Sequence, residues 1–173
     1  AVLYDERGER EQAATYISLA LDYHPRNPMV HELAGEYFLA NGDVGQARTH
    51  AETAVSLNGD FRRGFDLLSR IELVDERYSE AAEAAERIIE INSESTRGWY
   101  LLGLAESGKG EDVAAVDALE RATEIDPDDE ISRLALESVV RASFEVGEEI
   151  REEVAEFRFD RARSLAEDNL FVQ

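Results

Sequence analysis

One interval constrains the fold of this chain more than any other feature of its sequence. Alanine recurs every 34 residues, at Ala13, Ala47, Ala81 and Ala115. Two further series keep the same step, namely Ala20, Ala54, Ile88 and Ala122, and Tyr23, Leu57, Ile91 and Ile125. A fixed period in this range indicates a solenoid, because no single unit of that size buries its own apolar face. We therefore expect a stack of similar units whose function is an extended binding surface.

Each complete unit carries two apolar stripes with helical spacing. In residues 28–61 the first stripe is Val30, Leu33, Ala34, Tyr37 and Phe38. Asn41-Gly42 ends that helix, and a second helix is expected at about residues 44–57. Small residues recur where the two helices meet, and we expect an alanine of the second helix opposite Gly35, Ser69 or Gly103. Short side chains at these positions let two antiparallel helices approach closely.

The chain resembles the tetratricopeptide repeat family, whose units have 34 residues and two helices. The residues that carry the closest match are Trp99, Leu102, Gly103, Ala115, Leu119, Ala122 and Pro127. The unit at 62–95 departs from the pattern, with Glu76 in place of a turn glycine and Glu72 where an aromatic residue is usual. The resemblance implies an all-α, right-handed superhelical solenoid of antiparallel helix pairs, with about four repeats and a C-terminal helical extension. It divides residues 1–129 into a partial repeat at 1–27, starting midway through its first helix, and repeats at 28–61, 62–95 and 96–129.

Residues 130–173 are harder to assign because the period is lost after Pro127. One helix is expected at 130–145, and a longer one at about 148–169. The longer helix has two interpretations: a terminal cap with a polar outer face, or the first helix of a further, displaced repeat. We favour the second, because the chain stops where the next helix is due. Together with the start inside a helix, this suggests a segment of a longer array.

Charge and composition restrict the partners. The chain has 39 acidic and 18 basic residues, a formal net charge of −21. Such a surface argues against binding nucleic acid and against docking on an anionic membrane. No apolar run approaches the roughly 18 residues of a membrane span, so direct membrane insertion is not expected. The absence of cysteine excludes disulfides and thiolate metal sites but does not indicate a compartment.

Motifs for chemistry are missing from the sequence. No glycine-rich phosphate loop follows a strand, and nothing orders serine, histidine and aspartate into a triad. His24, His31 and His50 lack the spacing of a metal-binding helix pair, so we expect them in turns or in lateral packing. The sequence therefore predicts no catalytic residue, no cofactor and no metal, and we expect that the protein is not an enzyme.

The resemblance implies that the first helix of each pair lines a concave face. The side chains predicted to project there are Met29, Glu32, Glu36, Leu39, Arg63, Asp66, Arg70, Leu73, Arg97, Tyr100, Leu104 and Ser107. Arg63, Arg70 and Arg97 are notable in so acidic a chain, since guanidinium groups bind carboxylates in bidentate fashion. One hypothesis is a peptide with an acidic group near these arginines and apolar anchors near Leu39 and Leu104. The other is that the arginines pair with glutamate and aspartate of adjacent units.

The predicted function is therefore a non-catalytic scaffold that binds a peptide or protein partner on the concave face. One subtype of the family grips C-terminal carboxylates with lysine and asparagine in this groove, and this chain has neither at the corresponding places. Two alternatives stay open: a self-association module, which predicts a homo-oligomer, and a regulatory region of a larger protein. The sequence indicates neither the partner's identity nor the compartment.

Overall fold

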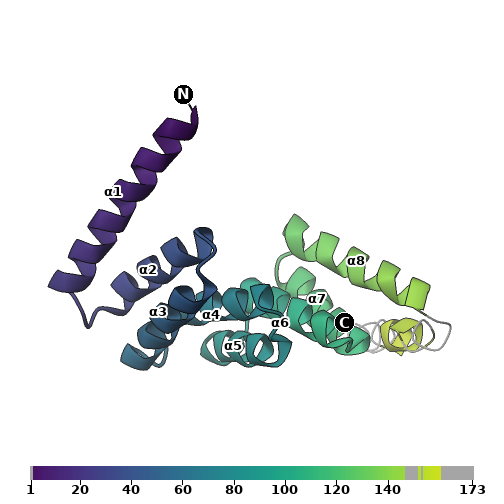
Figure 1. The fold of residues 1–173 in the computed structure, drawn as a ribbon. Coiled ribbons are helices and arrows are strands. Elements are labelled where there is room, and N and C mark those ends of the chain that lie inside the picture. Colours follow the sequence, from purple (N-terminus) through teal and green to yellow (C-terminus); the bar gives the residue numbers. More distant parts are fainter. Residues whose placement is uncertain (1, 147–151, 153, 161–173) are drawn as a thin grey trace. The chain divides into compact units, whose positions relative to one another are not determined.

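The computed structural model describes residues 2–146, 152 and 154–160, and within these ranges the chain is helical with no β-strand (Figure 1). The helices are α1 (Val2–Tyr23), α2 (Pro28–Ala40), α3 (Val44–Leu57), α4 (Arg62–Val74), α5 (Tyr78–Ile91), α6 (Thr96–Lys109), α7 (Asp112–Ile125) and α8 (Glu130–Val146). Residues 154–160 are also helical. The predicted all-α architecture of helix pairs is confirmed.

The helices begin at constant intervals. α2, α4, α6 and α8 start at Pro28, Arg62, Thr96 and Glu130, each 34 residues after the last. α3, α5 and α7 start at Val44, Tyr78 and Asp112, with the same step. We call the first set A helices and the second set B helices.

The period continues into α8, which corrects the expectation that it is lost after Pro127. Asp129 accepts a hydrogen bond from the backbone N–H of Ser132 at 3.2 Å, and Ser95, one period earlier, accepts from Gly98 at 3.2 Å. Both are N-caps of an A helix. The apolar pattern concealed this match because the residue types changed while the capping position did not.

The turns between A and B helices share one backbone geometry. The three residues with positive φ in these turns are Gly42 (79°), Glu76 (58°) and Gly110 (81°), again 34 apart. The N–H of the following residue donates back to the A helix in each turn: Asp43 to Phe38 at 2.9 Å, Arg77 to Glu72 at 2.8 Å, and Glu111 to Glu106 at 3.0 Å. This pattern satisfies carbonyl groups that a helix C-terminus leaves unpaired. Glycine adopts the left-handed conformation freely, whereas Glu76 is strained by it.

The expected close approach of A and B helices is also present. A Cβ atom added to Gly35 would lie 3.2 Å from the carbonyl oxygen of Ala47, and one added to Gly103 would lie 3.2 Å from that of Ala115. At the equivalent position of the second pair, α4 and α5, the Ser69 hydroxyl donates to the carbonyl oxygen of Ala81 at 3.0 Å. A glycine, or a serine that donates a hydrogen bond, at this position therefore lets the A and B helices of each pair pack closely.

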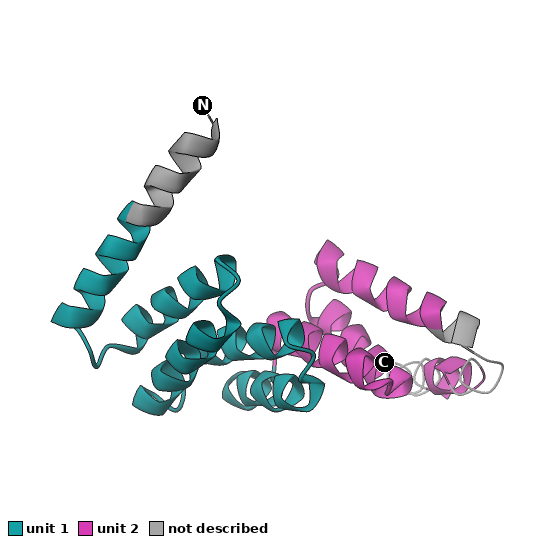
Figure 2. Cartoon of the chain, in the orientation of Figure 1, with its two compact units in different colours: residues 1–93 teal, residues 94–173 magenta. Residues whose placement is uncertain are grey.

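The chain forms two compact units, residues 1–93 and 94–173 (Figure 2), and each is described by itself. Unit 1 contains α1 to α5, with a core of Ala47, Ala51, Leu67 and Ile71. Unit 2 contains α6, α7, α8 and residues 154–160, with a core of Ala115, Val116, Leu119, Val139 and Val154. Most of the predicted helix at 148–169 lies outside the described residues.

The N-terminal helix departs from the expected partial repeat. α1 runs without a break through Gly8, which stands one period before the turn glycine Gly42. The helix that precedes the repeat of Leu33 is therefore a single helix and not an A/B pair. The Leu33 side chain is 55% exposed, whereas its equivalent Leu67 is fully buried. The prediction that Leu33 lies on a packed face of the helix is therefore wrong.

Candidate partner-binding surfaces

The predicted site residues of unit 1 lie on two neighbouring A helices. α2 carries Glu32, Glu36 and Leu39, and α4 carries Arg63, Asp66 and Arg70. The two helices contact each other because the 34-residue repeat places successive A helices side by side. The structure therefore brings these six residues into one region.

Ion pairs link the charged members of this set. Arg63 donates to Glu32 at 2.8 Å, and Arg70 contacts Glu36 at 2.5 Å and Asp66 at 3.5 Å. Burial opposes the charge on Arg70, but the hydrogen bonds and negative charges of Glu36 and Asp66 together outweigh it and raise the pKa of Arg70 above its ordinary value. Both arginines pair with carboxylates of the chain itself. Of the two hypotheses for Arg63 and Arg70, pairing with adjacent units is the arrangement that the structure shows.

The pairs have a regular geometry. Glu36 and Arg70 are one period apart, so equivalent positions of consecutive repeats carry opposite charges. Glu32 is almost fully buried under Arg63, although it lies on an A-helix surface. We call the set of Glu32, Glu36, Arg63, Asp66 and Arg70 the ion-pair ladder. It joins α2 to α4 and leaves no excess positive charge on this face.

The apolar anchors predicted for this face are partly used by the fold. Leu39 is half-buried and packs against the core of unit 1. In unit 2, Leu104 is also half-buried. Met29, by contrast, is 56% exposed on α2, beside the exposed Leu33. The start of α2 therefore carries two exposed apolar side chains, whereas the predicted anchor Leu39 is partly used by the core.

The predicted residues of unit 2 line a hollow. Arg97 and Tyr100 on α6 border a cavity of about 310 Å³, whose other walls include Asp126, Asp129 and the exposed Ile131. The Arg97 guanidinium carbon lies 5.4 Å from the centroid of the Tyr100 ring, a cation–π distance. Aromatic, cationic, anionic and aliphatic groups thus meet between the A helices α6 and α8.

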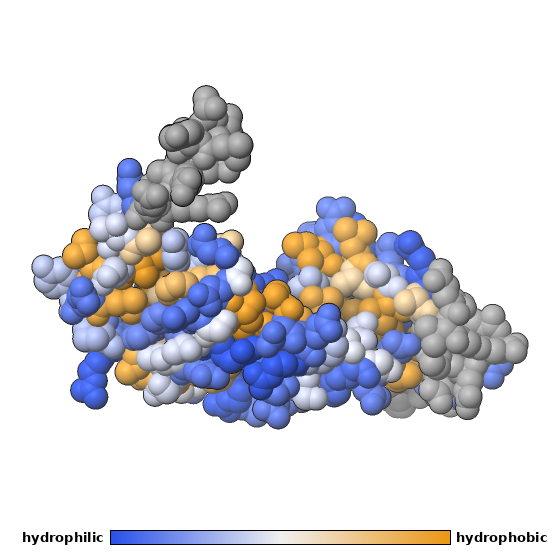
Figure 3. Space-filling model, viewed as in Figure 1, coloured by the Kyte–Doolittle hydropathy of each residue, from blue (hydrophilic) through white to orange (hydrophobic). Residues whose placement is uncertain are grey.

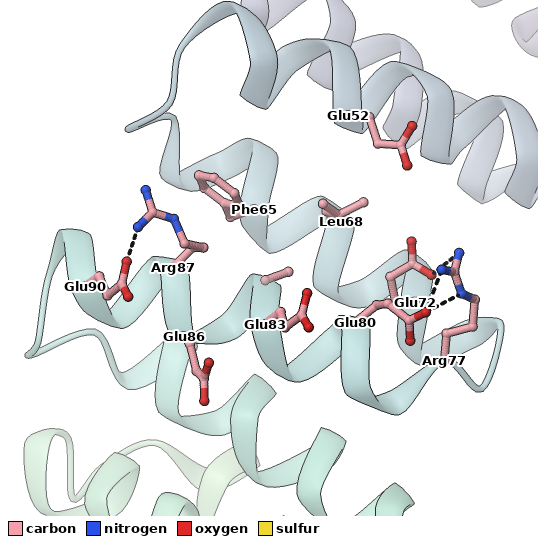
Figure 4. A pocket seen from close by; sticks show the side chains of 11 residues that line it. Glu52, Phe65, Leu68, Glu72, Arg77, Glu80, Glu83, Glu86, Arg87 and Glu90 are labelled. Atoms are coloured by element: carbon pink, nitrogen blue, oxygen red, sulfur yellow. Dashed lines mark hydrogen bonds and ion pairs between the residues drawn. The ribbon is translucent and has the colours of Figure 1, made fainter.

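A second hollow, in unit 1, was missed in the sequence analysis. A groove of about 460 Å³ lies over α3, α4 and α5 (Figure 4), with Phe65, Leu68 and Ala84 among its walls. Its carboxylates are Glu52, Glu72, Glu80, Glu83, Glu86 and Glu90, against the guanidinium groups of Arg77 and Arg87. We call it the glutamate groove. The sequence feature that indicates this groove is the repetition of glutamate, separated by pairs of alanines, within residues 78–91.

The two ends of the glutamate groove are internally paired. At one end, the buried Glu72 accepts from Arg48 at 2.8 and 3.0 Å and contacts Arg77 at 3.3 Å. At the other, Arg87 pairs with Glu90 and lies 5.5 Å from the centroid of the Phe65 ring. In Figure 3 the surface around α5 is strongly hydrophilic.

Two histidines pack laterally, as expected. The Nδ1 atoms of His31 and His50 are 3.1 Å apart, and the His50 ring stacks on Phe38 with an interplanar angle of 5°. The Nε2 atom of His31 lies 3.0 Å from the carbonyl oxygen of Pro25 and therefore carries a hydrogen. In neutral His31 the Nδ1 atom then accepts from His50. Burial, and after it the neighbouring His31, lowers the pKa of His50 below its ordinary value.

The remaining chemistry of the described residues is limited. They contain no group of three histidine, cysteine or acidic residues placed to hold a metal ion. None of the helices that the structure describes combines the length and the apolar character needed to cross a membrane.

Comparisons with known proteins agree on the fold. The structure is similar to MamA from Desulfovibrio magneticus RS-1, with a TM-score of 0.72 and 20% identity over 94% of this chain and 89% of that one. It is similar to the second TPR domain of human RPAP3 in complex with the HSP70 peptide SGPTIEEVD, with a TM-score of 0.60 and 15% identity over 65% of this chain and 98% of that domain. The first TPR of Spaghetti (RPAP3), bound to the HSP90 peptide SRMEEVD, has a TM-score of 0.64 and 14% identity over 67% of this chain and 92% of that one. No curated relative matches in sequence.

A family model supplies the sequence evidence. The model described as tetratricopeptide repeat matches residues 1–61 and 67–130, which is well over half of the chain. This match agrees with the 34-residue step of the helices and with the three equivalent turns. The chain belongs to the tetratricopeptide repeat family.

Proposed function

We propose that this protein is a non-catalytic interaction module that binds a polypeptide partner on the surfaces of its A helices. The observation that carries the proposal is the hollow between α6 and α8 in unit 2. There Arg97 is exposed and Tyr100 is half-buried, so both present polar and aromatic groups to solvent. Aromatic residues and arginine are the types that contribute most to protein interfaces.

The fold relatives support this reading. The RPAP3 domains similar to this chain are bound to peptides of HSP90 and HSP70. Both peptides, SRMEEVD and SGPTIEEVD, are acidic at their C-terminal ends. For the present chain we propose the same kind of ligand, an extended polypeptide segment, without assigning it those partners.

The chemistry of the hollow suggests what the segment carries. Arg97 offers a planar fork for a carboxylate or a main-chain carbonyl, and Tyr100 and Ile131 offer apolar contact. Asp126 and Asp129 stand beside them and already accept hydrogen bonds from the backbone N–H groups of Asp128 and Ser132. Ligand recognition here therefore combines one acidic or carbonyl group with an apolar side chain.

The ion-pair ladder contributes differently. A ligand carboxylate reaching Arg70 has to displace Glu36 or Asp66, so simple acid recognition at this place is costly. We propose that Glu36, Arg63, Asp66 and Arg70 bind main-chain groups of the partner and set its direction, that the buried Glu32 holds Arg63 in place, and that Leu39 offers its remaining exposed apolar surface. Leu104 is proposed as an apolar neighbour of the unit 2 hollow.

A peptide array tests the proposal. Peptides selected on the wild-type chain are measured against Arg97→Glu by fluorescence anisotropy. We expect a loss of about tenfold or more in affinity, because an arginine at the centre of an interface is replaced by a repelling charge. The matched control is Arg121→Glu on α7, where an exposed arginine pairs with Glu124. Equal affinity of wild type and Arg97→Glu for every selected peptide contradicts the assignment.

Self-association is a second candidate, and α1 provides the observation for it. Tyr16 and Tyr23 on this helix are 69% and 77% exposed, an unusual quantity of aromatic surface for one helix. Sedimentation velocity over a hundredfold range of concentration separates the two candidates. A concentration-dependent dimer that Tyr16→Ser abolishes supports self-association through α1, and a constant monomer removes it.

A further inference from the structure

The glutamate groove and the ion-pair ladder lie on opposite sides of one helix. Phe65, Leu68 and Glu72 point into the groove, whereas Arg63, Asp66 and Arg70 form the ladder. At about 100° per residue, the mean directions of these two sets differ by roughly 160° around α4. The groove is therefore a separate surface of unit 1.

The groove combines an apolar floor with excess negative charge. Six carboxylates face two guanidinium groups among its lining residues, a formal net charge of four negative. Arg48 binds Glu72 from α3 and reduces that excess by one. Phe65 and Leu68 are only half-buried, so apolar surface stays open between the charged walls.

The chain's own arginines show which groups the ends of the groove accept. At one end the Arg77 guanidinium lies between the carboxylates of Glu72 and Glu80, at 3.3 and 2.6 Å. At the other, the Arg87 guanidinium lies over the Phe65 ring and pairs with Glu90. Each end thus holds a cation against carboxylates, once over an aromatic face.

The middle of the groove lacks such a cation. Glu52 on α3 and Glu83 on α5 lie on either side of Leu68 (Figure 4). Within the described part of the chain neither makes an ion pair, and both are exposed. The middle of the groove therefore has carboxylates, as the ends have, beside the half-buried Leu68, but among the described residues no guanidinium group is paired with them.

We propose that the glutamate groove is a docking site for a basic, amphipathic polypeptide segment. A lysine or arginine of the partner lies between Glu52 and Glu83, and an apolar side chain packs on Phe65 and Leu68. The floor from Phe65 to Glu72 is about 10 Å long at 1.5 Å per residue, which matches two turns of a helical partner. This site goes beyond the binding proposed for the A helices and does not depend on it.

The test uses a labelled peptide built from repeats of Arg-Arg-Leu-Leu and measures its affinity by fluorescence anisotropy. In Glu52→Gln/Glu83→Gln we expect the dissociation constant to rise about tenfold, because two exposed ion pairs are lost. The control is Glu152→Gln/Glu156→Gln, which changes the net charge equally at exposed positions outside the groove. Circular dichroism verifies that both variants stay folded.

Further arms separate the alternatives. A peptide of Arg-Arg-Ser-Ser repeats is expected to bind at least tenfold more weakly than the leucine peptide, because it cannot use the apolar floor. Equal binding of the two peptides, or an equal loss in the Glu152/Glu156 control, means attraction to overall charge and overturns the proposal. So does sedimentation showing self-association that Glu52→Gln/Glu83→Gln abolishes, since the occupant is then a second copy. Arg97→Glu is expected to leave binding of this probe unchanged, so failure here is distinct from failure of the A-helix proposal.

Discussion

Repeats 28–61 and 62–95 share a backbone and differ in the chemistry that holds it. Both have an A helix, a turn with a residue at positive φ, and a B helix that starts 16 residues after the A helix. In the first, Phe38 stacks on His50, and Gly42 makes the turn. In the second, Glu72 replaces the aromatic ring and Glu76 replaces the glycine. The repeat position thus determines backbone geometry but leaves the stabilising interaction open.

The difference arises from the neighbours of each position. Glu72 is buried, yet it receives two hydrogen bonds from Arg48 of the preceding B helix and contacts Arg77 of its own turn. A buried carboxylate is tolerated when it is paired and hydrogen-bonded in this way. Phe38 instead packs by ring stacking on His50 and needs no partner of opposite charge. Substitutions in the two repeats should therefore differ in their effect on stability.

Glu72→Ala removes the buried carboxylate that pairs with Arg48 and Arg77. We expect the free energy of unfolding to fall by about 3 kcal/mol, because Arg48 and Arg77 lose their shared carboxylate and a cavity is left. Arg48 keeps Asp75 at 2.6 Å, which limits the loss. Urea denaturation measures it.

Glu106 is the matched control, because it stands at the same repeat position in 96–129 and pairs only with Lys109 at 2.8 Å within the described residues. Glu106→Ala is expected to cost less than about 1 kcal/mol. Equal losses at Glu72 and Glu106 contradict the special role given to the Arg48 pair.

Gly35→Ala tests how closely the first helix pair packs. The new Cβ would lie 2.7 Å from Cδ2 of Leu67 and 3.2 Å from the Ala47 carbonyl oxygen. Overpacking of this kind costs about 2 kcal/mol, partly offset by the better helix propensity of alanine. Ser69→Ala at the equivalent position removes only the hydrogen bond to Ala81, at about 1 kcal/mol. A smaller loss for Gly35→Ala than for Ser69→Ala, in thermal or urea unfolding, contradicts the close packing.

Glu76→Gly should stabilise the protein, because it relieves the left-handed conformation at the turn. The expected gain is about 1 kcal/mol. Gly42→Ala is the mirror experiment and should lose about the same amount. An unchanged or lowered stability of Glu76→Gly means that the glutamate side chain compensates its own strain.

Most of the architecture was predictable because it depends on spacing. Period, helix pairs and turns follow from small residues at fixed intervals, and a substitution such as Glu76 for glycine did not hide them. The start of α8 at residue 130 was predicted, but the continuation of the 34-residue period into this helix was missed, because its capping residues Asp129 and Ser132 carry the period while its apolar residues do not. The continuous α1 was missed because Gly8 stands at the turn position of the repeat yet is helical in the structure.

The candidate sites were less predictable for a different reason. The A-helix residues predicted for unit 1 lie together on α2 and α4, but whether Arg63 and Arg70 are free depends on Glu32 and Glu36 in another repeat. The pairing of Arg48 with Glu72 also joins residues that are 24 apart, a spacing unrelated to the period. Contacts between repeats depend on side-chain geometry, so the sequence allowed both free and paired arginines.

The histidine pair gives the smallest effect and sharpens the contrast by pH. It belongs to repeat 28–61 alone, since the equivalents of His31 and His50 in 62–95 are Phe65 and Ala84. The pKa of His50 is lowered in the folded state. At a pH below the ordinary pKa of histidine, the unfolded chain therefore binds a proton at His50 more readily than the folded chain does. The stabilisation is therefore complete above about pH 6.5 and is lost as the pH falls through the folded-state pKa.

Acid also neutralises carboxylate repulsion, which acts in the opposite direction, so the measured quantity is the difference between wild type and His50→Gln. We expect that difference to shrink from pH 8 to pH 5 in urea denaturation. A difference independent of pH means that His50 contributes only through its stacking on Phe38.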